Sequence, residues 1–209
     1  MDALERYALA SSTPQGEVLA WLERASWLRT SHGRQICGPV VGALLRHLVL
    51  LLRPQRILEI GTFTGYSAIW MAGALPEGGC IDTLEINDEM EDIIREAFAR
   101  AGMADRIRLS IGDACDLLPL SDEYYDLVYM DGNKREYAAY YRSVIDRVRP
   151  GGYIVADNVL WDGKVSADVP PRDQQTTGIL AFNDLVAGDD RVENFILPLR
   201  DGLNIIRKK

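Results

Sequence analysis

The sequence predicts an α/β fold: a doubly wound, mostly parallel sheet with helices before it and an antiparallel hairpin at its end. Three observations lead to this prediction. Residues 1–52 show helical periodicity, short apolar runs alternate with helical segments from Arg56 onward, and two strand-like runs flank a turn near the end of the chain. Alternating strands and helices are typical of parallel sheets, and a terminal hairpin adds antiparallel strands at one edge.

Two helices are predicted in the N-terminal part of the chain. From Glu17 to Arg29, apolar residues recur at the spacing of one helix face, about every 3.6 residues. A second amphipathic helix is predicted from Val40 to Leu52, and Arg53-Pro54 ends it. We interpret residues 1–52 as a helical extension packed on a single domain that comprises residues 1–209.

Five strand-and-helix units follow, and a hairpin closes the chain. Each predicted strand is a short run rich in apolar, β-branched or aromatic residues, as is usual for strands buried in a parallel sheet. The irregular segment from Val159 to Gln174 is predicted to be a lid or binding loop, because long loops at the carboxyl edge of a sheet commonly carry function. The strands are predicted at residues 57–60, 80–85, 106–110, 125–131 and 153–157, the helices between them at 66–75, 88–101 and 137–148, and the hairpin at 192–197 and 203–207.

The composition is that of an ordinary globular protein. With 23 basic and 31 acidic residues the formal net charge is −8, which gives no general attraction to phosphate backbones or anionic lipids. No apolar run approaches the roughly 20 residues that span a bilayer; the nearest, Leu44 to Leu52, is short and contains an arginine and a histidine. The N-terminus lacks a signal-peptide pattern, and Cys37, Cys80 and Cys115 are interpreted as free thiols, so a cytoplasmic protein is expected.

Polar side chains follow two neighbouring predicted strands at the point where each strand ends. Asp131 ends the fourth strand, with Lys134 three residues later, and Asp157-Asn158 end the fifth. Because ligands collect at the carboxyl ends of parallel strands, two carboxylates and an amide oxygen are expected in one small volume. Such oxygen ligands suit a hard divalent cation, above all Mg²⁺. An Asp-Asn pair after a strand is often only a turn or a helix cap, but its combination with Asp131 and Lys134 favours a metal site.

The loop after the first predicted strand favours a nucleoside ligand that carries a positive charge. Gly61 and Gly65 let a ligand approach the backbone where a helix begins, but their spacing lacks the third glycine of a dinucleotide site. Glu59, expected to point to the same place, would repel a pyrophosphate and attract a cationic amino group. Glu85 ends the second strand, where an acid accepts ribose hydroxyls, and Ala114 would border an adenine. S-adenosylmethionine fits this description.

With these motifs the sequence resembles the cation-dependent O-methyltransferases, the family of catechol O-methyltransferase and plant caffeoyl-coenzyme A O-methyltransferase. The likeness runs from about Gly38 to Arg207. The resemblance implies a Rossmann-like class I methyltransferase fold, and an O-methyltransferase that uses S-adenosylmethionine with Mg²⁺ or another divalent cation such as Mn²⁺ or Ca²⁺. Its strongest motifs are Leu58-Glu59-Ile60-Gly61 with Gly65-Tyr66-Ser67, Asp131 to Tyr137, Ala156-Asp157-Asn158, and Leu197-Pro198 with Asp201-Gly202.

The resemblance also implies roles for individual residues. Asp131, Asp157 and Asn158 match the metal ligands, and Lys134 matches the residue that takes the proton from the reacting hydroxyl. The chain departs from the family at Asn133, where catechol O-methyltransferase has an aromatic gatekeeper, so the resemblance does not define the shape of the acceptor pocket. The positions that match the S-adenosylmethionine site are Glu59, Gly61, Thr62, Ser67, Glu85, Ala114 and Asp131.

The expected acceptor is a small phenol or catechol that binds the cation through neighbouring oxygens. Some bacterial members of the family methylate hydroxylated uridine in transfer RNA, and the net charge of −8 counts against that alternative. A nicotinamide-dependent oxidoreductase is disfavoured by the missing third glycine and by Glu59. A non-catalytic cofactor-binding protein is disfavoured by the complete set of Asp131, Lys134, Asp157 and Asn158. Because the bacterial and plant members are dimers, a homodimer is expected, with the apolar N-terminal helices at a two-fold interface.

Overall fold

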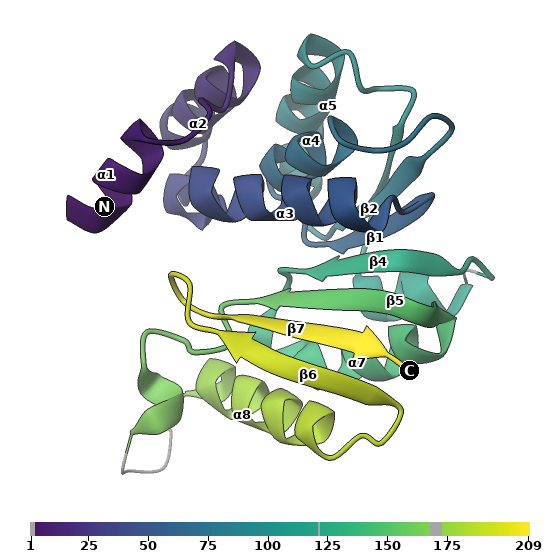
Figure 1. Cartoon of the computed structure of the whole chain (residues 1–209). Coiled ribbons are helices and arrows are strands. Elements are labelled where there is room, and N and C mark those ends of the chain that lie inside the picture. The colour runs from purple at the N-terminus through teal and green to yellow at the C-terminus, as the bar shows by residue number, and fades with distance from the viewer. Residues whose placement is uncertain (1–2, 121, 168–172) are drawn as a thin grey trace.

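Seven strands form one sheet with the order β3-β2-β1-β4-β5-β7-β6 (Figure 1). The computed structural model describes residues 3–120, 122–167 and 173–209. Strands β1 to β5 run parallel to their neighbours, and β7 pairs antiparallel with both β5 and β6. The strands are β1 (Arg56–Ile60), β2 (Cys80–Glu85), β3 (Ile107–Ile111), β4 (Tyr125–Met130), β5 (Val148–Asp157), β6 (Val192–Leu197) and β7 (Leu203–Lys208).

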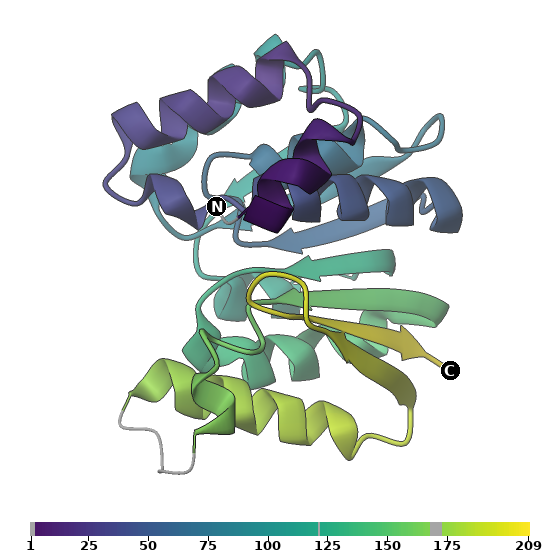
Figure 2. The same ribbon diagram turned by 60° about the vertical axis from the view of Figure 1, so that its left-hand side comes forward.

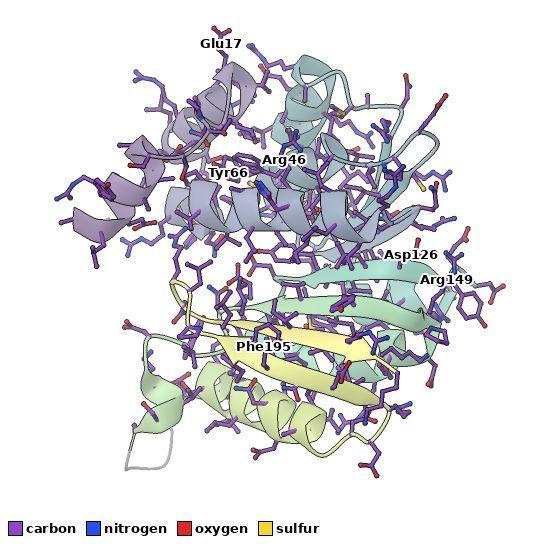
Figure 3. All side chains as sticks on the ribbon, in the orientation of Figure 1. Glu17, Arg46, Tyr66, Asp126, Arg149 and Phe195 are labelled. Carbon is purple, nitrogen blue, oxygen red and sulfur yellow. The ribbon has the colours of Figure 1, made fainter. Side chains whose placement is uncertain are left out.

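Helices cover both faces of this sheet (Figure 1 and Figure 2). Side chains fill the space between these helices and the sheet (Figure 3). Apolar residues of α2, α3, α4 and α5 form one buried cluster with residues of the sheet, and those of α6, α7 and α8 form a second cluster on the opposite face. The predicted fold class, including the antiparallel hairpin at one edge, is therefore confirmed. The helices are α1 (Ala3–Ala10), α2 (Glu17–Arg29), α3 (Gly38–Leu52), α4 (Tyr66–Ala72), α5 (Glu91–Arg100), α6 (Ala114–Leu117), α7 (Tyr137–Val144) and α8 (Gln174–Ala187).

Strand β5 differs most from its prediction, since it begins at Val148 and not at residue 153. Val148 pairs with Tyr125, and the register then shifts before Leu127 pairs with Tyr153. Gly151, with a φ of +80°, lies in this irregular stretch, so the Pro-Gly-Gly sequence forms a bulge inside the strand and does not precede it. The preceding helix α7 ends early, at Val144, and a 3₁₀ turn connects it to the strand.

The N-terminal helix α3 also has an unexpected property. Together with the turn before it, the segment Gly33–Leu52 is long and apolar enough, at 20 residues, to cross a membrane by length and composition alone. The sequence analysis had found no such run. In the fold, α3 buries Val41, Leu45 and Val49 in the core beside the sheet. One face of α3 is thus packed in the domain, whereas Leu50 and Leu51 near its end are exposed.

The strand order reverses between β1 and β4, and this reversal positions the site. Ile60 of β1 is level with Met130 of β4, and Met130 is level with Ala156 of β5. The next residues, Gly61, Asp131 and Asp157, therefore emerge side by side at the switch point where doubly wound sheets bind ligands. Gly61 has a φ of +96°, and a Cβ atom there would lie 2.4 Å from the backbone oxygen of Asp131. The close approach of these two loops thus requires glycine.

Candidate active site

A cavity of about 530 Å³ opens at the carboxyl ends of β1, β2, β4 and β5. We call the wall formed by the loops after β1, β2 and β3 the glycine-loop half, and the wall formed after β4 and β5 the aspartate half. The structure brings nearly all of the predicted site residues to this one cavity. Those that line it are Gly61, Thr62, Ser67, Glu85 and Ala114 in the glycine-loop half and Asp131, Lys134, Asp157 and Asn158 in the aspartate half.

In the aspartate half, Asp131 and Asp157 lie close enough for their charges to interact. Asp157 is only 3% exposed. Burial, and next the negative charge of Asp131, raise the pKa of Asp157 above its ordinary value. The convergence predicted from two separate strand ends is therefore present. Two carboxylates that repel each other, with the side chain of Asn158 on the same wall, form an oxygen-rich donor set that suits a hard divalent cation.

A second group of possible ligands, which includes a thiol, lies elsewhere among the described residues and does not line the cavity. The ligand atoms of Asp113, Cys115 and Glu136 lie within 4.8 Å of one another. However, the carboxylate of Asp113 accepts the backbone N–H of Cys115, and that of Glu136 accepts the hydroxyl of Tyr140. These contacts give both acids a structural role, as a helix cap and a side-chain anchor.

Lys134 is held at the base of the aspartate half by two hydrogen bonds. Its Nζ donates to Oδ1 of Asp131 at 2.6 Å and to the hydroxyl oxygen of Tyr137 at 2.7 Å. The Tyr137 hydroxyl in turn donates towards the backbone oxygens of Asp157 and Met130, at 2.9 and 3.1 Å. Because a carbonyl can only accept, Tyr137 must act as the acceptor for Lys134. Two of the tetrahedral positions on Nζ are thereby fixed, and Lys134 lines the cavity.

Tyr137 has a second function besides its bond to Lys134, because it also packs in the core. Its ring packs edge-on against Phe182, with 5.4 Å between ring centroids, and the residue is fully buried. The bond to Lys134 is a contact that the sequence analysis missed. The signal was present, since a residue three positions after Lys134 on the same helical turn lies next to it.

In the glycine-loop half, Glu59 lies beneath the cavity wall. It is fully buried, and its two carboxylate oxygens accept the hydroxyls of Ser67 and Thr83. Glu59 and Thr83 are register partners on β1 and β2, which explains why the carboxylate turns towards the neighbouring strand. Burial raises the pKa of Glu59 to about 7 despite these two hydrogen bonds. Glu59 therefore positions Ser67, which does line the cavity, and its predicted contact with a ligand stays a prediction.

Glu85 reaches the cavity itself and is held by the backbone. Its Oε2 accepts the N–H of Phe63 at 2.6 Å and its Oε1 accepts the N–H of Asn87 at 2.9 Å. Burial raises the pKa of Glu85. Each carboxylate oxygen retains a further acceptor position. Glu85 can therefore accept a pair of neighbouring hydroxyls from a ligand, such as those of a ribose.

Other residues that line the cavity come from segments whose positions the spacing of apolar residues did not predict. Cys37, at the start of α3, and Trp161, in the loop after β5, both line it. Arg200 donates to the backbone oxygen of Cys37 and so ties the turn before β7 to α3. The predicted lid is only partly described, because its residues 168–172 lie outside the described part of the chain. Its described part contributes Trp161 to the cavity.

Comparison with known proteins agrees with this geometry. The model of a family described as O-methyltransferase matches residues 10–209. A catechol O-methyltransferase from Niastella koreensis is 35% identical over 166 residues, which cover 78% of this chain and 75% of that protein. Caffeoyl-CoA O-methyltransferase 1 from Nicotiana tabacum is 33% identical, with 99% of this chain and 92% of that protein covered.

A solved structure shows the same architecture with a ligand. The O-methyltransferase from Bacillus cereus, determined in complex with S-adenosylhomocysteine (SAH), superposes with a TM-score of 0.92 at 31% identity and covers 99% of this chain and 97% of its own. SAH is what remains of S-adenosylmethionine after methyl transfer. Given the family match over nearly the whole chain and the site described above, this chain belongs to the O-methyltransferase family and is an S-adenosylmethionine-dependent O-methyltransferase.

Proposed function

We propose that this enzyme transfers the methyl group of S-adenosylmethionine to a hydroxyl of a small phenolic, catechol-like acceptor that is bound through a divalent cation. The observation that carries the proposal is the shared cavity, in which Asp131, Lys134, Asp157 and Asn158 face the glycine-rich loop. The names of similar proteins, a catechol and a caffeoyl-CoA O-methyltransferase, support the choice of acceptor class.

The donor set fits a cation that is bound by Asp131, Asp157 and Asn158. The two acids carry up to two negative charges in a buried place, and Lys134 supplies one positive charge. A divalent ion such as Mg²⁺ would offset the imbalance, and when bound it would lower the pKa of an acceptor hydroxyl. Glu85 and the loop from Gly61 would hold S-adenosylmethionine, which supplies the methyl group from a positively charged sulfur.

The protein's own contribution is to position the reactants and to move one proton. In its uncharged amine form, after one proton has left to solvent, Nζ of Lys134 donates its two N–H groups to Asp131 and Tyr137 and takes the proton of the acceptor hydroxyl on its free electron pair. Bound S-adenosylmethionine would supply its methyl group to this oxygen, and the electron pair of the broken carbon–sulfur bond would stay on its sulfur. The residues that would hold both reactants lie at the ends of rigid strands. Holding the reactants in the reactive geometry lowers the activation free energy of methyl transfer.

The test is methyl transfer by the purified protein to catechol and to phenol, with Mg²⁺ and with excess chelator. We expect methylated catechol in Mg²⁺, little product from phenol, and none in chelator. Full activity in chelator would contradict the metal-dependent mechanism. Methylation of hydroxyuridine-containing transfer RNA without methylation of any catechol would contradict the acceptor class.

A further inference from the structure

Tyr129, on β4, carries a hydroxyl that the packing around it does not need. The residue is fully buried, and its ring belongs to the apolar cluster between the sheet and α3. A phenylalanine would fill the same space without a polar group, whereas a buried hydroxyl that lacks a partner costs about 1–3 kcal/mol. Among the described residues the hydroxyl makes one hydrogen bond, to Oδ2 of Asp157 at 2.7 Å.

The sheet register explains how this bond forms. Tyr129 is paired with Val155 of β5, and side chains two residues apart on a strand point to the same face. Asp157 lies two residues beyond Val155, so it is the diagonal neighbour of Tyr129 across the two strands. The phenol therefore approaches from the core, while Asp157 borders the cavity.

The bond controls the orientation of the Asp157 carboxylate. Oδ1 accepts the backbone N–H of Asn158 at 2.7 Å, and Oδ2 accepts the hydroxyl of Tyr129. Each oxygen keeps one further acceptor position for another partner. The N–H of Asn158 is adjacent in the chain and moves with Asp157 itself. The hydroxyl of Tyr129 thus fixes this carboxylate relative to β4, the strand that Asp131 directly follows.

We propose that Tyr129 is a positioning residue for the cation site, because its hydroxyl holds Asp157 in the orientation in which Asp131 and Asp157 bind the same divalent ion. The inference rests on the proposed function, in which Asp157 is a metal ligand. Groups that hydrogen-bond a metal ligand typically change metal affinity or activity by about 10- to 100-fold. An effect of that size separates Tyr129 from an ordinary core residue.

Tyr141 offers a matched control within the same chain. It is also fully buried, and its hydroxyl also donates to an aspartate, Asp189, at 2.9 Å. That pair joins α7 to the turn between α8 and β6, and neither residue lines the cavity. Tyr141→Phe therefore removes the same chemical group, a tyrosine hydroxyl that donates to an aspartate, without a link to the proposed cation.

The experiment measures Mn²⁺ binding by electron paramagnetic resonance in the wild type, Tyr129→Phe and Tyr141→Phe, with SAH present and no acceptor. We expect the dissociation constant for Mn²⁺ to rise about 10- to 100-fold in Tyr129→Phe and to stay within about two-fold in Tyr141→Phe. The affinity for SAH should be unchanged in both variants, which shows that the glycine-loop half is intact.

Two results would overturn the inference: Mn²⁺ binding to Tyr129→Phe that matches the wild type, or an equal loss in Tyr141→Phe. Failure of the proposed function looks different, because the wild type itself would then bind no Mn²⁺. Activity adds a second readout. Excess Mn²⁺ should restore most of the methyl transfer by Tyr129→Phe but not by Asp157→Ala, since the first variant keeps every ligand and the second has lost one.

Discussion

The two halves of the cavity hold their acidic side chains in different ways. In the glycine-loop half, Glu59 accepts two hydroxyls and Glu85 accepts two backbone N–H groups, so uncharged donors hold each carboxylate. In the aspartate half, Asp131 forms an ion pair with Lys134, and burial together with the charge of Asp131 raises the pKa of Asp157. The glycine-loop half thus holds its side chains in fixed positions, and the aspartate half keeps a negative charge that a bound cation can offset. Substitutions in the two halves should therefore affect different measurements.

The largest effect is expected from the aspartate half. Lys134→Ala removes the group that takes the acceptor's proton, and we expect kcat to fall by about 10²- to 10⁴-fold. Asp157→Ala should lower turnover to a similar level through loss of a metal ligand. Because both side chains lie outside the glycine-loop half, the affinity for SAH, measured by calorimetry, should change little. A kcat of Lys134→Ala equal to that of the wild type would show that Lys134 does not take the proton.

The second effect concerns stability and comes from the glycine-loop half. The pKa of Glu59 is about 7 in the folded protein against 4.5 as its ordinary value. The folded protein thus keeps a proton that the unfolded chain loses between these values, so stability falls as pH rises from 4.5 to about 7. Glu59→Gln does not titrate. The variant should therefore gain stability relative to the wild type across this window, by an amount on the order of 3 kcal/mol.

Denaturant unfolding of the ligand-free wild type and Glu59→Gln at pH 5 and pH 8 measures this difference. Comparing the two proteins at each pH cancels the other titrating groups, Asp157 included. A stability difference that does not change between the two pH values would show that Glu59 is ionised in the fold. In that case the glycine-loop half would carry charge as the aspartate half does, and the contrast between the halves would disappear.

The sequence predicts the convergence of Asp131 and Asp157 for a general reason. Parallel strands deliver their carboxyl ends to one edge, so two polar strand ends on neighbouring strands must meet there. The alternation of apolar runs and helical segments was sufficient to place both strands. The same rule found the site residues at a strand end or directly after one, Glu85 and Asn158 among them.

Contacts that depend on three-dimensional packing could not be found in this way. The depth of Glu59 follows from its pairing with Thr83 across two strands, and a sequence does not give strand register. The hydroxyl of Tyr129 matters only because Asp157 is its diagonal neighbour, and in the sequence it is one more aromatic residue in an apolar run. Cys37 and Trp161 also line the cavity. They lie at a helix start and in a loop, and the spacing of apolar residues does not predict where such segments lie relative to the sheet.

The third effect tests whether Lys134 is oriented by its neighbours. Tyr137→Phe removes one of the two acceptors that fix Nζ, and we expect kcat to fall about 10-fold, the size of one hydrogen bond to a charged group. KM for the acceptor should stay near the wild-type value, because Tyr137 is buried behind Lys134. In a Lys134→Ala background the same substitution should have no further effect on kcat. An equal loss in both backgrounds would show that Tyr137 acts on the fold and not through Lys134.

The smallest effect is expected in the glycine-loop half, where uncharged donors hold the carboxylates. Glu85→Gln keeps a side-chain oxygen as acceptor but places an amide where a carboxylate oxygen met the N–H of Phe63 or Asn87. The affinity for SAH, measured by calorimetry, should fall by about three- to ten-fold, since one acceptor for the ligand is lost and the loop shifts slightly. Mn²⁺ binding should be unchanged, because the aspartate half makes no hydrogen bond to Glu85 among the described residues. A loss of Mn²⁺ affinity in Glu85→Gln would mean that the two halves are coupled through the Gly61–Asp131 contact, and they would then have to be treated as one site.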